Sequence, residues 1–217
     1  MLKINKYSMK GEEIGTKTLP KSLFAVESKN PKALIYEVIK TYLGNQRKGN
    51  SSTQTRAEAK GSGKKLYKQK GTGNARPGNL RTPLRVGGGV AFGPKPKDWY
   101  KKIPKKKKRL ALKLALTERA NEKQVILLDS LDFNEPDTKA AKELLAKITP
   151  ERSKKLILID GSDVNVIKSF SNIPYVTMDR ADCVYPYEVL HCNCLIITEA
   201  ALNKMKEVFA KWNKQEK

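Results

Sequence analysis

The chain of 217 residues is long enough for one ordinary domain, and 39% of its residues are hydrophobic. Its formal net charge is +22, with 44 lysines and arginines against 22 acids. This charge favours a polyanionic partner, and no apolar run reaches the ~18–20 residues of a membrane span. An anionic membrane surface would need an amphipathic basic helix, whereas the basic stretch is rich in Gly and Pro, so nucleic acid is the expected partner.

Two short strands are expected near the amino terminus, over residues 2–7 and 19–26, with a turn between them. A helix follows, because Pro31 suits the first helical position behind Asn30 and apolar residues then recur at helical spacing. Gly44 is expected to end this helix in a left-handed conformation.

The basic stretch over residues 48–104 shows neither the helical nor the strand period. The wider range of residues 40–110, which includes this stretch, contains 21 lysines and arginines but only two acids, Glu58 and Asp98. Residues 40–110 therefore carry 19 of the 22 net charges. A segment of this length without apolar periodicity is usually functional or disordered. We therefore predict an extended basic loop that neutralises phosphates and becomes ordered when it binds them.

Glycines recur throughout this loop and are predicted to take positive φ angles and to let the backbone approach a partner closely. They stand at positions 61, 63, 71, 73, 78, 87, 88, 89 and 93. Gly71–Arg76 fits only half of the dinucleotide fingerprint, and Gly61–Lys64 lacks the Walker spacing, so no cofactor is expected. The loop's aromatic residues offer stacking surfaces for unpaired bases: Tyr67, Phe92, Trp99 and Tyr100.

Strands and helices alternate after the loop. Helices are expected over 110–121, opened by Lys105–Arg109, from Pro136, after Asp163 and after Thr198, and strands over 125–128, 156–159, 175–178 and 194–198. This alternation predicts an α/β fold with an open, mostly parallel sheet flanked by helices on both faces. Residues 1–47 and 105–217 would form the globular domain, and residues 48–104 the extended basic loop.

Four acids follow expected strands, where α/β proteins commonly bind ligands. Asp129, Asp160, Asp179 and Glu199 could hold Mg²⁺ in a nucleic-acid enzyme, which is the alternative function. The simpler interpretation, which we favour, is that they form turns and cap helices. His191 is the only histidine, so no Ser–His–acid arrangement is available, and we expect no enzyme activity.

Three cysteines, Cys183, Cys192 and Cys194, indicate a reducing compartment, because their number is odd and no signal-peptide core precedes them. A cytoplasmic location is expected. The spacing of His191, Cys192 and Cys194 is too tight for a zinc site, so the thiols are interpreted as ordinary strand residues, without a metal.

The loop's motifs, taken together, closely resemble the ribosomal protein L4 family of bacterial large subunits. The matching segments are Thr53–Glu58, Gly61–Lys65, Lys68–Gly73, Ala75–Arg76, Gly87–Lys97, Pro104–Lys106, Arg109–Lys113 and Leu195–Leu202. The resemblance implies a structural, ribosome-bound protein whose globular domain anchors on 23S rRNA. It also implies a loop that threads through the rRNA and helps to line the nascent-peptide exit tunnel opposite ribosomal protein L22. The partners would then be 23S rRNA, L22 and the nascent polypeptide.

The family's tunnel-wall loop tip corresponds here to Lys68, Gln69, Lys70, Gly71, Thr72, Gly73 and Asn74. The family commonly has tryptophan at the position of Tyr67 and arginine at that of Asn74, so this chain lacks one cation at the tip. The cations that we expect to contact rRNA, mostly at phosphates, are Arg56, Lys60, Lys64, Lys65, Lys68, Lys70, Arg76, Arg81, Arg85, Lys95, Lys97, Lys101, Lys105, Lys106, Lys107, Lys108 and Arg109.

Overall fold

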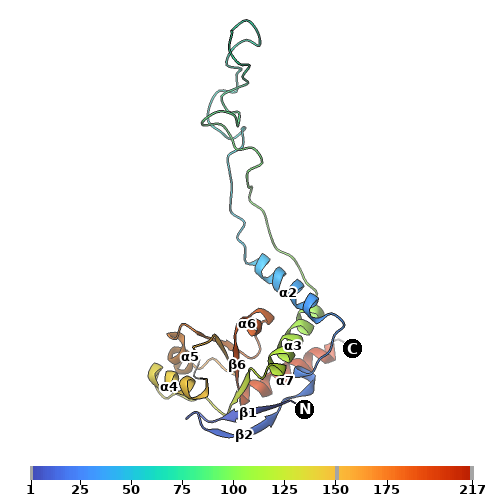
Figure 1. The fold of residues 1–217 in the computed structure, drawn as a ribbon, viewed down its shortest axis with the longest axis vertical. Helices are drawn as coiled ribbons and strands as arrows, with labels where there is room; N and C mark the ends of the chain where they lie inside the picture. The colour runs from blue at the N-terminus through green and yellow to red at the C-terminus, as the bar shows by residue number, and fades with distance from the viewer. Residues whose placement is uncertain (1, 150–151, 216–217) are drawn as a thin grey trace. The chain divides into compact units, whose positions relative to one another are not determined.

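A computed structural model describes residues 2–149 and 152–215 of the protein (Figure 1). Within these residues, one sheet contains six strands in the order β2-β1-β3-β6-β4-β5. The strands are β1 (Lys3–Tyr7), β2 (Glu13–Thr18), β3 (Val125–Leu128), β4 (Lys155–Ile159), β5 (Val176–Arg180) and β6 (Cys194–Thr198). Only β2 is antiparallel to its neighbour, so the predicted α/β fold with a mostly parallel sheet is confirmed.

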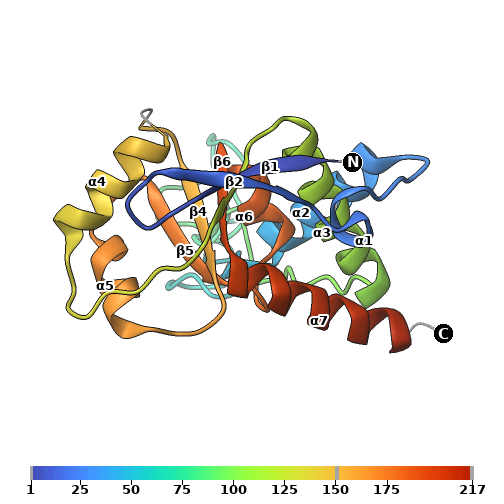
Figure 2. The ribbon, with the colours of Figure 1, turned by 90° about the horizontal axis from the view of Figure 1, so that it is seen from below.

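Helices cover both faces of this sheet, with α4 and α5 on one side and α3 and α7 on the other (Figure 2). The helices are α1 (Lys21–Phe24), α2 (Pro31–Asn45), α3 (Lys105–Asn121), α4 (Thr138–Ile148), α5 (Val164–Ser171), α6 (Pro186–His191) and α7 (Glu199–Gln215). Side chains alternate across the central strands, because Leu195 packs on the α3 and α7 side and Ile196 on the α4 and α5 side. The continuous apolar runs follow from this two-sided burial.

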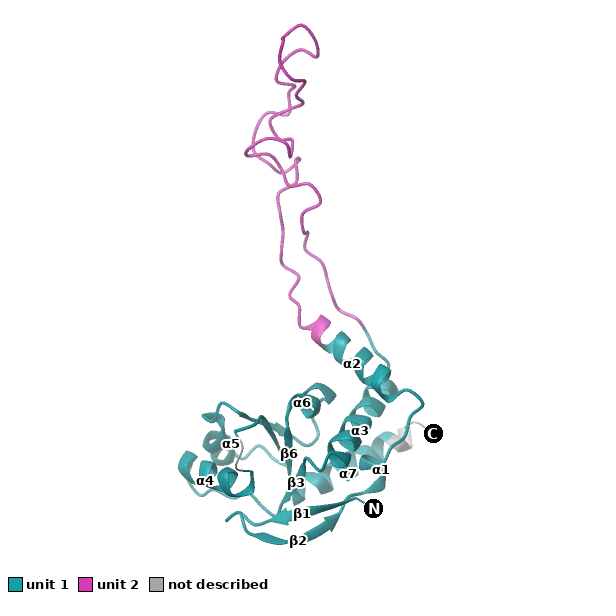
Figure 3. Cartoon of the chain, viewed as in Figure 1, with its two compact units in different colours: residues 1–42, 102–217 teal, residues 43–101 magenta. Residues whose placement is uncertain are grey.

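The chain divides into two compact units, which Figure 3 colours separately. Unit 1 comprises residues 1–42 and 102–217 and contains the sheet, and unit 2 comprises residues 43–101. No helix in the described part of the chain is long and apolar enough to cross a membrane.

The predicted strand over residues 19–26 is wrong. The second strand is β2, and α1 follows it immediately. Leu23 and Phe24, the last two residues of α1, are both buried; adjacent side chains can face one core from a helical turn, whereas in a strand they point to opposite faces. Pro20 precedes this turn and accepts hydrogen bonds at its carbonyl from the backbone N–H groups of Leu23 and Phe24.

Gly44 does not end α2, contrary to prediction, because the helix continues to Asn45. The Asn45 side chain makes two hydrogen bonds to the backbone of Lys101, at 2.8 and 3.0 Å. These bonds join residues 56 positions apart, so local helix-ending signals could not reveal them.

Helix starts in the second half agree with prediction to within two residues. Helix α4 starts at Thr138 rather than at Pro136, and Asp137 caps it through its carboxylate, which accepts from the N–H of Lys139 at 2.8 Å. Thr198 Oγ1 accepts from the N–H of Ala201 at 3.2 Å and caps α7 as predicted. Asp163 precedes α5, although its side chain makes no capping bond.

Helix α6 was not predicted, and it changes the interpretation of two cysteines. Cys194 lies in β6, but Cys192 ends α6, and Cys183 is exposed in the turn after β5. Burial raises the pKa of the Cys192 and Cys194 thiols to about 11. Both thiols are therefore protonated and unreactive at neutral pH.

Candidate nucleic-acid interface

Three of the four acids that could have formed a magnesium site, Asp129, Asp160 and Glu199, pair with lysines. Lys6 Nζ lies 2.6 Å from Asp129 Oδ1 and 2.6 Å from Glu199 Oε2, and Lys17 also pairs with Glu199. Asp160 and Asp129 line a cleft of about 250 Å³ at the carboxyl edge of the sheet. Among residues 2–149 and 152–215, no group of three or more His, Cys, Asp or Glu residues could hold a metal ion. The ion pairs give Asp129 and Glu199 a structural role.

We expect replacement of Glu199 by glutamine to lower the free energy of unfolding at pH 7 by about 1–2 kcal/mol, the range for partly buried charged hydrogen bonds. Hydrogen bonds from Lys17 and Lys6 lower the pKa of the Glu199 carboxyl to about 2. Its stabilising contribution is present above its ordinary pKa of about 4.5 and is lost as the pH falls toward 2. Urea unfolding between pH 7 and 3 should therefore show a shallower pH dependence for E199Q than for the natural chain. Parallel curves would contradict this prediction.

Unit 2 consists mainly of two arms of chain that run side by side without forming a regular ladder (Figure 1). Isolated backbone hydrogen bonds of 2.8–3.1 Å join the arms: Lys97 N–H to Gly49 O, Thr53 N–H to Pro94 O and Val90 N–H to Gln54 O. Such sparse pairing holds the arms together while leaving most of their backbone and side chains facing outward.

Several loop glycines allow these arms to pack closely. A Cβ atom on Gly89 would lie 2.2 Å from the backbone nitrogen of Arg56, and one on Gly93 would lie 2.0 Å from Thr53 Oγ1. Both distances are far below van der Waals contact. At Gly89 and Gly93 the close approach is between two segments of the same chain, and the approach of loop glycines to a partner stays a prediction.

Glu58, one of the two acids in unit 2, fixes a turn in the outgoing arm. Its carboxylate accepts hydrogen bonds from Lys95 Nζ, at 2.7 and 2.9 Å, and from the N–H of Thr55 at 2.8 Å. These contacts lower the pKa of the Glu58 carboxyl to about 2, with Lys95 the largest cause. Sequence reasoning missed this role, although Thr55-x-x-Glu58 matches the capping-box pattern.

The loop tip is closed by Tyr67, whose hydroxyl donates to the carbonyl of Ala75. This hydrogen bond joins the two residues that flank residues 68–74, the segment that the resemblance assigns to the tip. Gly71 and Gly73 adopt φ angles of +81° and +70°, as predicted, and have open space around them. The same prediction is wrong for five other loop glycines, which do not adopt positive φ: Gly63, Gly78, Gly88, Gly89 and Gly93. All seven residues are exposed, so the lysines of the tip are accessible to a partner.

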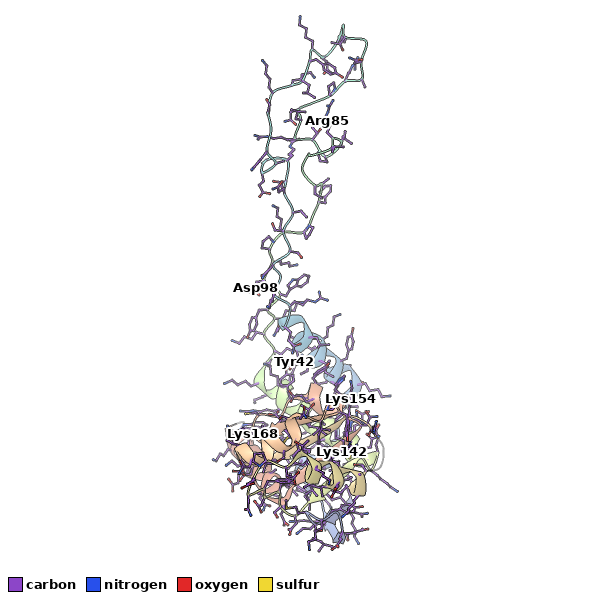
Figure 4. The ribbon with its side chains drawn as sticks, turned by 90° about the vertical axis from the view of Figure 1, so that its left-hand side faces the viewer. Tyr42, Arg85, Asp98, Lys142, Lys154 and Lys168 are labelled. Carbon is purple, nitrogen blue, oxygen red and sulfur yellow. The ribbon has the colours of Figure 1, made fainter. Side chains whose placement is uncertain are left out.

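Cations dominate the surface of unit 2, which has 14 lysines and arginines against two acids and hence a net charge of +12. Their side chains spread outward from both arms, as seen for Arg85 in Figure 4. Asp98, the other acid, accepts from the N–H of Tyr100 at 2.8 Å. With both acids engaged in contacts of their own, most of the positive charge remains uncompensated.

The predicted cations fall into two groups. Six have partners within their own unit: Lys65 with Gln69, Arg81 with Gly61 O, Lys95 with Glu58, Lys97 over Trp99, Lys107 with Glu37 and Arg109 over Trp212. Over the described ranges, the side chains of the others make no hydrogen bond, ion pair or ring contact: Arg56, Lys60, Lys64, Lys68, Lys70, Arg76, Arg85, Lys101, Lys105, Lys106 and Lys108. Lys105–Arg109 open α3 in unit 1, and the rest lie in unit 2.

Comparison with known proteins places this loop and sheet in a family. The model of the ribosomal protein L4/L1 family matches residues 17–208. The large ribosomal subunit protein uL4 of Syntrophomonas wolfei is 42% identical over 210 residues, which cover 97% of this chain and 100% of that protein. The uL4 proteins of Alkaliphilus metalliredigens and Finegoldia magna are each 40% identical, over 97% and 96% of this chain and 100% of their own. The chain therefore belongs to the ribosomal protein L4/L1 family.

Proposed function

We propose that the protein is a structural component of the large ribosomal subunit and that unit 2 binds 23S rRNA. The observation that carries this proposal is the net charge of +12 on 59 residues whose cations are mostly exposed. The names of the relatives support the ribosomal role, because each is a large ribosomal subunit protein. No enzymatic role is proposed.

Binding works through charge and shape. The arms supply cations on several sides, so rRNA segments fold around the arms. The cations relieve the repulsion between the phosphates of those rRNA segments. Lysine and arginine contacts to phosphate position the protein without reading the sequence of bases. Unit 1 anchors the protein on rRNA, and the cluster Lys105–Arg109 at the start of α3 contributes to this anchoring.

The tip of unit 2, residues 68–74, forms part of the nascent-peptide exit tunnel in this proposal. Lys70 faces the tunnel, L22 lies opposite, and the nascent polypeptide passes between them. The exposure of the tip supports this assignment, and so does its closure by the Tyr67–Ala75 hydrogen bond. The protein would then reside on ribosomes in the cytoplasm.

A photocrosslinking residue at position 70 tests the proposal at the tip. On ribosomes carrying a stalled nascent chain, it should crosslink to 23S rRNA and to the nascent chain. The matched control is the same residue at position 142, an exposed lysine of α4, which should not reach the nascent chain. Equal crosslinking from both positions, or none from position 70, would contradict the tunnel assignment.

A further inference from the structure

Phe92 stands out among the aromatic residues of unit 2. The residue is completely exposed, at 107%, and its backbone φ is +53°. A bulky residue rarely adopts this conformation, and a fully exposed phenyl ring gains nothing from burial. Both features are unfavourable for the free chain, so they suggest a contact made only in a complex.

The other loop aromatics already have partners or lesser exposure. Trp99 makes cation–π contacts with two cations, with Arg47 Cζ 5.1 Å and Lys97 Nζ 4.7 Å from its ring centroid. The Tyr67 hydroxyl is used to close the tip, and Tyr100 is 67% exposed. Phe92 is therefore the ring that unit 2 presents most completely.

The backbone on both sides of Phe92 is fixed to the opposite arm. Val90 N–H donates to Gln54 O at 2.8 Å, and Pro94 O accepts from Thr53 N–H at 3.0 Å. Gly93 packs against Thr53 so closely that a Cβ atom would not fit. The turn at Phe92 is thus anchored before and after the ring, which presents the ring outward at a low entropic cost on binding.

We propose that Phe92 stacks on an unpaired base of the RNA that unit 2 binds. This inference rests on the proposed function, because the net charge of +12 selects a polyanion as the partner. An RNA offers an apolar surface beside its phosphates only at unstacked bases, and aromatic side chains stack on their faces. Leu84 and Val86 are comparably exposed but have no ring with which to stack.

The test measures binding of the full chain to protein-free large-subunit rRNA from the source cells, over a series of salt concentrations. Phe92→Gly is the key variant, because glycine accepts the positive φ without strain and removes the whole benzyl side chain. We expect F92G and F92L to bind about five- to a hundredfold more weakly, the range for loss of one stacked base. Phe92→Trp should bind at least as tightly as the natural chain, and its added tryptophan emission should be quenched by the RNA.

The controls separate this inference from the proposed function. Leu84→Ala removes an equally exposed apolar side chain and should change affinity less than twofold. The salt slope should stay the same in all Phe92 variants, because no phosphate contact is lost. If the natural chain binds in a salt-dependent way and F92G and F92L bind with the same affinity, the stacking inference alone is overturned. Absence of binding by the natural chain would overturn both. Normal rRNA affinity in F92G combined with failed subunit incorporation would instead assign the ring to a protein neighbour.

Discussion

Replacement of Lys64, Lys68, Lys70 and Arg76 by glutamate is expected to lower the affinity for large-subunit rRNA on the order of a hundredfold or more at physiological salt. These four side chains are exposed and make no hydrogen bond, ion pair or ring contact with other described residues. Four charge reversals change the net charge of unit 2 from +12 to +4. Each lost phosphate contact should also reduce the slope of log K against log salt by about 0.7–0.9, so the slope should flatten by about 3.

The control for this variant carries four charge reversals in unit 1. Lys29, Lys139, Lys142 and Lys168 are exposed, and none is among the predicted rRNA contacts. Their replacement by glutamate changes the total charge equally but should leave most of the affinity and of the salt slope intact. Filter binding at several salt concentrations gives both quantities. Equal losses in the two variants would show that net charge alone, rather than the loop, drives binding.

Replacement of Gly89 by alanine is expected to separate the arms of unit 2. Its new Cβ atom would overlap backbone atoms of Thr55 and Arg56 at 2.2–2.6 Å, and backbone cannot move aside as a flexible side chain can. The adjacent bonds, Gly89 N–H to Arg81 O and Val90 N–H to Gln54 O, should be lost with it. We expect faster amide exchange at Val90 and a tenfold or greater loss of incorporation into large subunits.

Gly63→Ala is the matched control, because no heavy atom lies within 4 Å of its Cβ position and its φ is outside the left-handed region. This variant removes the same flexibility from the same loop without a steric clash. It should be incorporated as well as the natural chain. Equal incorporation of G89A and G63A would show that the contact between the arms is unnecessary for assembly.

The central fold could be predicted because its signals are local. The apolar runs of β3, β4 and β6 fill a sheet covered on both faces, and Thr198 caps α7 within one turn. The errors arose where distant contacts decide the structure. Asn45 pairs with Lys101 and prolongs α2 past Gly44, and α1 forms where Leu23 and Phe24 are buried against α3.

The sequence predicted which cationic residues make up the candidate interface, but not which contacts they and the loop glycines make. The density of charge along the chain identified the cations of unit 2. It could not show that Lys95 is paired with Glu58, or that Gly89 and Gly93 serve contacts between the arms. Those contacts join residues 33–40 positions apart, and a glycine's sequence neighbours do not reveal what its missing side chain would touch. The exposure of Phe92 likewise depends on the arrangement of both arms.

Sedimentation of a tagged copy of the protein from its own cell lysate tests the central proposal most directly. The lysate is centrifuged through a sucrose gradient at high salt, which removes loosely bound basic proteins because their phosphate contacts weaken. A structural role in the large subunit predicts that the tagged protein remains with that subunit at close to one copy each. Migration at the top of the gradient, apart from the large subunit, would contradict that role.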